Sequence, residues 1–215
     1  MQSSFAWGCG ALSCCMARPT GPGEVASVAD HAAESLSFIR HAMERGSTFS
    51  AVPGIGGAIM GGIGLTAAAV AAWQPSAERW LAVWLLGAAV ALTTAVVTMR
   101  RKAARLGATL AGAPARRFAL SLSAPLIAGA ALTLGLWMHG VWALMPAAWL
   151  LLYGAGVVTG GAFSVAPMRL LGVCFMALGL LALVTPPSWG NMWLGAGFGA
   201  LQVGFGLYIA RTHGG

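Results

Sequence analysis

The stretch WALMPAAWLLLYGAGVVTGG, residues 142–161, decides the fold class of this chain. It contains no charged side chain, and its only hydroxyl groups belong to Tyr153 and Thr159. An α-helix that crosses the hydrocarbon core of a bilayer needs about 20 predominantly apolar residues. The stretch therefore predicts a membrane-spanning helix.

Comparable apolar runs lie on both sides of this stretch. With it they predict six spanning helices, and the fold class is an all-α polytopic membrane helix bundle. The other five predicted spans are 51–73, 79–99, 118–138, 167–186 and 190–210.

The composition of the whole chain agrees with this fold class. Hydrophobic residues make up 58% of the 215 residues and charged residues only 8%, whereas a soluble domain carries about 25% charged residues. A water-exposed surface is therefore excluded, and the lipid bilayer is the expected partner. The net charge of +7 is assigned to loops at the membrane surface, and no nucleic acid is expected to bind.

The basic residues predict the orientation, because short cytoplasmic loops are enriched in Lys and Arg. With the N-terminus inside, ten basic residues flank the inner ends of the spans and only Arg79 lies outside. The sequence thus predicts a multi-pass protein of a cytoplasmic membrane with both termini in the cytoplasm. The ten are Arg40, Arg45, Arg100, Arg101, Lys102, Arg105, Arg116, Arg117, Arg169 and Arg211.

Two segments precede the predicted transmembrane domain, 49–215. Residues 1–28 have no periodicity and are expected to be a disordered tail, or a product of a misassigned start with Met16 as the true one. Residues 29–48 predict an amphipathic helix on the cytoplasmic side, capped by Asp30 and ended by Gly46. Such a helix typically lies in the membrane interface, and the alternative is a docking helix for a partner.

Tryptophans gather near the outer ends of the spans, where indole rings favour the headgroup level. We predict an outer aromatic belt, with an aromatic vestibule for an apolar or cationic ligand as the alternative. The belt comprises Trp73, Trp80, Trp137, Trp142, Trp189 and Trp193.

An internal echo follows three tryptophans on the even-numbered spans. Trp84-Leu-Leu-Gly-Ala, Trp149-Leu-Leu-Leu-Tyr-Gly-Ala and Trp193-Leu-Gly-Ala suggest three copies of a two-helix hairpin. Biased composition produces similar echoes by chance, so both interpretations stay open.

Chemistry-bearing side chains are scarce. The last acidic residue is Glu78, and the only histidine among the spans is His139, in a short outer loop. Proton relays, general acid/base catalysis, haem ligation and metal sites need more than this. We therefore predict no catalytic residue, no cofactor and no metal.

Three small-xxx-small pairs of glycines fit the pattern that lets helix backbones approach one another. Reading them as phosphate-binding loops fails, since no strand precedes them and no Lys follows. The predicted packing glycines are Gly57, Gly61, Gly156, Gly160, Gly195 and Gly199.

Gln202 is the one carboxamide near the middle of the predicted membrane, and Tyr153 and Thr159 are polar groups at depth on another span. An amide in hydrocarbon must find hydrogen-bond partners. We interpret the three as candidate intramembrane polar contacts, which either join helices or line a path for a small neutral solute.

The segments Phe49-Ser-Ala-Val-Pro-Gly, Arg79-Trp-Leu-Ala-Val-Trp-Leu, Leu150-Leu-Leu-Tyr-Gly-Ala and Ile209-Ala-Arg form a further pattern. It resembles a group of uncharacterised bacterial multi-pass membrane proteins with six helices. The resemblance covers about residues 30–215 and implies no activity, so no functional residue comes with it.

The sequence favours a non-enzymatic scaffold or accessory subunit of a membrane assembly, meeting a membrane-protein partner or a second copy of itself. The alternative is a facilitator or transporter of a small neutral or lipophilic solute, which would use Gln202.

Overall fold

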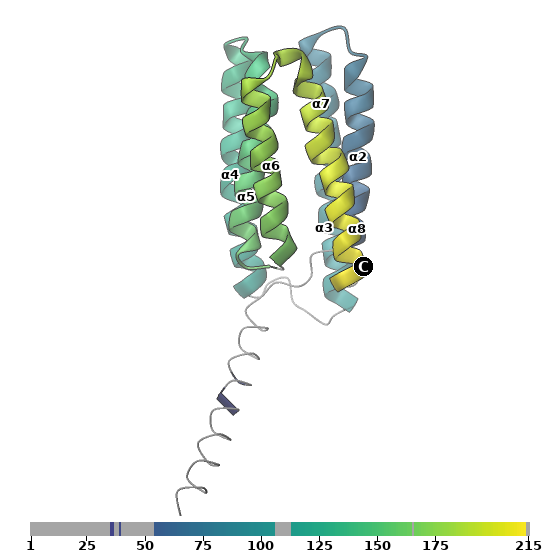
Figure 1. Ribbon diagram of the computed structural model, residues 1–215, viewed down its shortest axis with the longest axis vertical. Helices are drawn as coiled ribbons and strands as arrows, with labels where there is room; N and C mark the ends of the chain where they lie inside the picture. Colours follow the sequence, from purple (N-terminus) through teal and green to yellow (C-terminus); the bar gives the residue numbers. More distant parts are fainter. Residues whose placement is uncertain (1–34, 37–38, 40–53, 106–112, 165, 214–215) are drawn as a thin grey trace, which may run out of the picture. The chain divides into compact units, whose positions relative to one another are not determined.

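The computed structural model describes residues 35–36, 39, 54–105, 113–164 and 166–213. The chain divides into two compact units, residues 1–45 and 46–215, and the architecture below concerns the second. Its described residues are helical throughout, with no strand among them (Figure 1). Of the predicted amphipathic helix, only Ser35, Leu36 and Ile39 are described, so that helix stays a prediction.

Six helices of the described part are long and apolar enough to cross a membrane, which confirms the all-helical prediction at this level. The first five are α2 (Gly54–Ala72), α3 (Ala77–Arg105), α4 (Ala113–Met138), α5 (Met145–Gly161) and α6 (Ala166–Val184). A 3-10 turn, Trp142–Leu144, comes directly before α5.

The sixth span has four pieces. They are the 3-10 turn Pro187–Trp189, α7 Gly190–Leu194, the π-helix η3 Gly195–Leu201 and α8 Gln202–His213. A π-helix of seven residues is unusual, because π-geometry mostly occurs as single-turn bulges. The hydropathy pattern did not predict it.

Helices α3 and α4 extend beyond the predicted spans, 79–99 and 118–138. At the end that carries the basic residues, α3 continues to Arg105 and α4 already begins at Ala113. The predicted spans end where charge begins, but Arg, Lys and Ala are good helix formers, so the helices continue past the apolar stretch. Arg100, Arg101 and Arg116 are therefore helical residues and do not belong to a loop.

The helices pack in two groups. The α2 group has α2 at its centre, packed against α3 and the sixth span, whereas the α5 group has α5 packed against α4 and α6. Figure 1 shows α4, α5 and α6 side by side, and α2, α3, α7 and α8 side by side. Of the three suggested hairpins, α2–α3 and α4–α5 are packed pairs. In the third, α6 packs chiefly on α5 and α8 chiefly on α2.

Backbone-to-backbone contact holds the α2 group together. A Cβ atom added at Gly61 would lie 2.5 Å from the Val203 nitrogen. One added at Gly54 would meet the Ala210 backbone, and one at Gly206 the Ala58 nitrogen. These positions admit no side chain, so α2 and α8 approach as closely as two helices can.

The α5 group contains a reciprocal pair of the same kind. A Cβ at Gly154 would lie 2.8 Å from the Gly172 carbonyl oxygen, and one at Gly172 would lie 2.7 Å from the Gly154 carbonyl oxygen. Gly179 lies against Leu151, whose nitrogen would be 3.0 Å away. Helices α5 and α6 thus meet through their backbones as α2 and α8 do.

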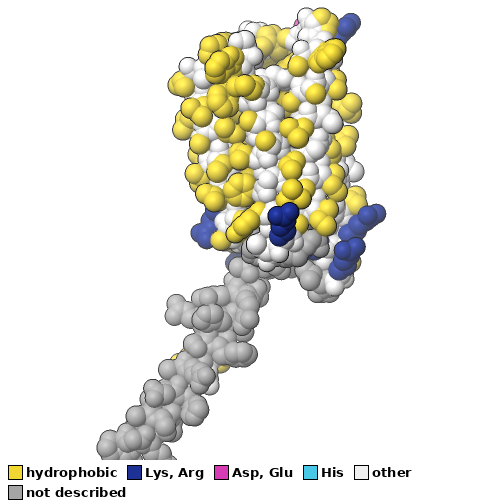
Figure 2. Space-filling view, turned by 45° about the vertical axis from the view of Figure 1, so that its right-hand side comes forward, with side chains coloured by type: hydrophobic (Ala, Val, Ile, Leu, Met, Phe, Trp, Pro, Cys, Tyr) yellow, Lys and Arg dark blue, Asp and Glu magenta, His cyan; other side chains and the backbone are white. Residues whose placement is uncertain are grey.

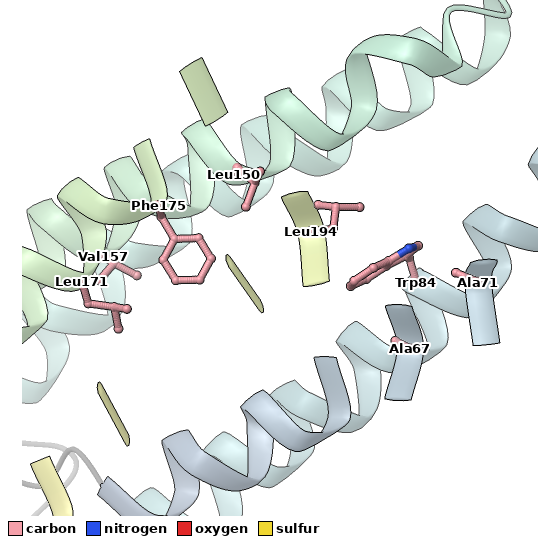
Figure 3. Packing of buried hydrophobic residues seen from close by; sticks show 8 residues of the cluster. All are labelled: Ala67, Ala71, Trp84, Leu150, Val157, Leu171, Phe175 and Leu194. Atoms are coloured by element: carbon pink, nitrogen blue, oxygen red, sulfur yellow. The ribbon is translucent and has the colours of Figure 1, made fainter. Parts of the chain in front are cut away.

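The main hydrophobic core lies where the two groups meet. Figure 3 shows Phe175 and Leu150 facing Trp84, with Leu194 among them. Phe175, Leu150 and Leu194 are fully buried. The cluster comprises Ala67, Ala71, Trp84, Leu150, Val157, Leu171, Phe175 and Leu194.

Candidate functional site: an aromatic seam

Six aromatic rings lie in a continuous chain of contacts between the two helix groups, and we call this set the aromatic seam. Each group contributes three rings. The α2 group supplies Trp80, Trp84 and Phe198, and the α5 group supplies Trp149, Tyr153 and Phe175.

The seam changes character along its length. At one end Trp80 stacks on Trp149, with ring centroids 5.7 Å apart and planes 8° from parallel. At the other end Tyr153, Phe175 and Phe198 meet at centroid distances of 4.7, 4.9 and 5.1 Å with tilted or edge-on rings. Such pairs contribute about 0.5–1.5 kcal/mol each beyond the area they bury. The seam is therefore a stable contact made of side chains.

Gln202 joins the two groups at the end of the seam where Tyr153 lies. Its side-chain amide donates through Nε2 to the Tyr153 hydroxyl at 3.2 Å. The residue is 7% exposed, and its Oε1 is the one buried side-chain polar atom without a hydrogen-bond partner among the described residues. Gln202 and Tyr153, both predicted as polar contacts, thus contact each other. The Oε1 atom of Gln202 remains an acceptor without a donor.

The π-helix sets the position of Gln202, which is the first residue after it. Within η3, a Cβ at Gly197 would lie 2.5 Å from Leu150 Cδ2 and 3.1 Å from Phe175 Cε1. The glycine thus lets the α5 group press directly on the π-helix. Because π-geometry is frequent at functional sites, this segment and Gln202 form the candidate site.

Thr159 lies elsewhere, on the contact between α4 and α5. Its hydroxyl is 3.1 Å from the Ser121 carbonyl oxygen, and 3.0 Å from the Ala155 carbonyl of its own helix. Ser121 is four residues before Pro125, which lies inside α4 and has no N–H to offer that carbonyl. Thr159 therefore gives a hydrogen-bond donor to the carbonyl that the proline leaves without one.

Asn191 is the polar residue that sequence reasoning missed. Its Oδ1 accepts hydrogen bonds from the indoles of Trp80 at 3.2 Å and Trp84 at 3.1 Å, and its Nδ2 donates to the Ala68 carbonyl at 2.9 Å. One side chain of α7 thus binds both α2 and α3.

Two other tryptophans use threonine partners. The Trp149 indole donates to Thr133 Oγ1 at 2.7 Å, and the Trp193 indole donates to Thr185 Oγ1 at 2.8 Å. Both threonines also donate to a carbonyl four residues earlier in their own helix or its C-terminal turn. Two copies of the tryptophan echo thus share one arrangement, whereas Trp84 is bound by Asn191.

The six predicted belt tryptophans fall into two classes. Trp73 is 86% exposed, Trp137 and Trp189 are exposed, and Trp142 is half-buried. Trp80 and Trp193 instead turn inward, and their N–H groups are hydrogen-bonded within the protein. The belt stays a prediction for all six.

The predicted packing glycines differ in what they face. Gly61 faces backbone, and Gly57 lies 3.3 Å, measured from an added Cβ, from Gly206 Cα. The other four first meet side chains, which are flexible at three positions, whereas the Ala68 Cβ beside Gly195 moves only with its helix. Measured in the same way, Gly156 lies 3.2 Å from Leu122, Gly160 3.3 Å from Phe118, Gly195 3.1 Å from Ala68 and Gly199 2.5 Å from Leu65.

The chemistry available to the seam is that of one amide oxygen, one phenol and aromatic faces. Within the described ranges, no three His, Cys, Asp or Glu side chains lie close enough together to hold a metal. His139 is exposed and Cys174 is half-buried, neither of them in the seam. The arrangement can accept a hydrogen bond at Gln202 Oε1.

Comparison of the chain with protein-family models, curated proteins and solved structures finds no match. Any function must therefore be argued from the residues above.

Proposed function

We propose that the six long apolar helices cross the inner membrane of a bacterium, with both termini in the cytoplasm, and that the protein is a non-enzymatic scaffold or accessory subunit of a membrane assembly. The basic residues support this orientation. Those described gather at one end of the helices, apart from Arg79, as Figure 2 shows in part.

The observation that carries the scaffold proposal is the open flank of α3 and α4. Residues 85–101 of α3 and 119–138 of α4 include no buried residue. Their exposed faces hold small residues, including Ala88, Ala89 and Thr93 on α3 and Ala124 and Ala128 on α4. Small residues let a partner helix approach closely, so this flank suits a second membrane protein or a second copy of the chain.

The interior supports the same proposal. Its large side chains are closely packed, and the amide of Asn191 and the hydroxyls of Thr133 and Thr185 are used to join helices. A packed interior leaves the uncovered helix faces as the functional surface.

One observation favours the second candidate, a facilitator of a small neutral or lipophilic solute. Gln202 Oε1 is buried without a partner beside a π-helix, and such an oxygen can replace part of the water that a solute loses on entering a membrane. A solute path through this point would run along the aromatic seam.

Photo-crosslinking tests the scaffold proposal. A photoreactive residue is placed at Leu92 on α3 or Ile127 on α4, with Leu180 on α6 and Leu207 on α8 as exposed controls. In native membranes we expect a discrete protein adduct from α3 and α4 and none from the controls. Adducts to lipid alone at all four positions would contradict the proposal.

Reconstitution separates the two candidates. In vesicles that contain only this protein, a scaffold gives no saturable solute flux, and Gln202→Leu changes nothing. Flux that is abolished by Gln202→Leu but kept by Thr159→Val would establish the facilitator instead, since Thr159 is a hydroxyl on the α4–α5 contact and outside the seam.

A further inference from the structure

The inner end of the bundle carries a basic surface without acidic partners in its own part of the sequence. Arg100, Arg101, Arg105, Arg116, Arg117, Arg169 and Arg211 are all exposed. No Asp or Glu occurs after Glu78, and the acids before residue 46 lie outside the described residues. Exposed arginines of this number attract anions.

Four of these arginines lie on the two helix ends that meet at one corner, where α3 ends and α4 begins. Ala103 of α3 packs in one buried cluster with Ala115 and Phe118 of α4. Arg101 and Arg105 flank Ala103 in the sequence, and Arg116 and Arg117 lie between Ala115 and Phe118. The shared cluster places the two helix ends side by side, so these four arginines lie at the same corner of the bundle.

Helix stability does not explain the arginines on α4. They lie four and five residues into the helix, whose first turn has no acidic residue. The amino-terminal end of a helix carries partial positive charge, so cations there are unfavourable. An anion bound at this corner would offset that repulsion.

The surface becomes apolar one turn further along both helices. Val96 and Val97 lie four residues before Arg100 and Arg101, and Leu120 lies three residues after Arg117. All three side chains are exposed. A molecule that matches this surface carries an anionic group joined to a hydrocarbon chain, which excludes nucleic acid and free phosphate as the best fit.

We propose that the corner formed by the end of α3 and the start of α4 binds an anionic phospholipid. The arginines hold the phosphate through guanidinium hydrogen bonds, and the acyl chains lie along the exposed apolar residues of α3 and α4. The proposal rests on the membrane location proposed above, but not on the scaffold role.

The test uses the full chain in neutral detergent, titrated with phosphatidylglycerol or phosphatidylcholine and followed by native mass spectrometry. Basic residues at an anionic membrane surface each strengthen binding by about fivefold. The double variant R116Q/R117Q should therefore bind phosphatidylglycerol roughly 30-fold more weakly than the unmodified chain.

Two further double variants make the result specific. R79Q/R211Q removes the same charge from the opposite end of α3 and from the end of α8, and should change affinity by less than about threefold because neither residue lies at the α3–α4 corner and exposed charges are screened. R116K/R117K keeps the charge but not the guanidinium geometry, so its affinity should lie between those of R116Q/R117Q and the unmodified chain.

Three results would overturn the proposal. They are equal affinity for phosphatidylcholine, an equal loss in R79Q/R211Q, and displacement of the lipid by inorganic phosphate at the same concentration. Cysteine labelling of the two membrane faces tests the topology independently, so failure of lipid binding would leave the membrane location intact.

Discussion

The contacts within each helix group and the contact between the groups are made of different parts of the chain. Within the groups, α2 meets α8 and α5 meets α6 through glycines that lie directly against backbone atoms. Between the groups, the contact is made mainly by side chains, among them six aromatic rings, the aliphatic residues of the core and the Gln202 amide.

This difference has a mechanical consequence. A backbone atom in a helix moves aside only if the whole helix shifts, whereas a ring can change its rotamer or tilt. The groups should therefore behave as stiff units, and the aromatic seam should be the contact that yields. The predictions below measure that difference, starting with the largest effect.

Gly206→Ala should have the largest effect, because its Cβ would meet the Ala58 backbone in α2. We expect a loss of about 3 kcal/mol or more in unfolding free energy, at the upper end of the cost of overpacking. Denaturant titration in detergent micelles measures it.

Gly204→Ala is the matched control, two residues away on the same helix with nothing within 4 Å of an added Cβ. It should be neutral, or stabilising by up to about 1 kcal/mol through higher helix propensity. Equal losses in the two variants would mean that the α2–α8 contact is not backbone-limited.

Asn191→Leu should cost about 2–3 kcal/mol, because it leaves the indoles of Trp80 and Trp84 without their acceptor. The same titration follows it, and the tryptophan emission should shift as well. Thr93→Val is the control, since that hydroxyl donates only within its own helix. A neutral Asn191→Leu would show that Asn191 does not hold α2 and α3 to the sixth span.

Gly156→Ala should cost less than about 1 kcal/mol, because the nearest atom to an added Cβ is the flexible Leu122 side chain at 3.2 Å. Gly172→Ala in the same group, facing the Gly154 carbonyl, should cost clearly more. If thermal unfolding ranks them in the opposite order, the distinction between yielding and unyielding neighbours is wrong.

Hydropathy was sufficient to predict six long apolar helices, because a membrane-length helix leaves a one-dimensional signal in the sequence. It did not give the full lengths of α3 and α4 at their basic ends, because arginine ends an apolar run without ending a helix. The amino-acid composition of the seven-residue π-helix does not distinguish it from an α-helix.

Which helices pack against each other could not be predicted from the sequence, for a different reason. A small-xxx-small spacing identifies a face but not its partner, so Gly54, Gly64, Gly172 and Gly206 were missed although each faces backbone. Asn191 was missed since its partners lie more than 100 residues away in the chain. Gln202 was found because an amide at depth is conspicuous by itself.

Phe198 allows the most direct test, because it belongs to both kinds of contact. Its ring lies in the aromatic seam, and its backbone carbonyl lies where a Cβ on Gly64 would be. Comparing the unfolding free energies of Gly64→Ala and Phe198→Leu therefore probes the two contacts at one residue. We expect a loss of about 3 kcal/mol or more for Gly64→Ala and of about 1–1.5 kcal/mol for Phe198→Leu. A larger loss in Phe198→Leu than in Gly64→Ala would contradict the account, since the seam would then be the less yielding contact.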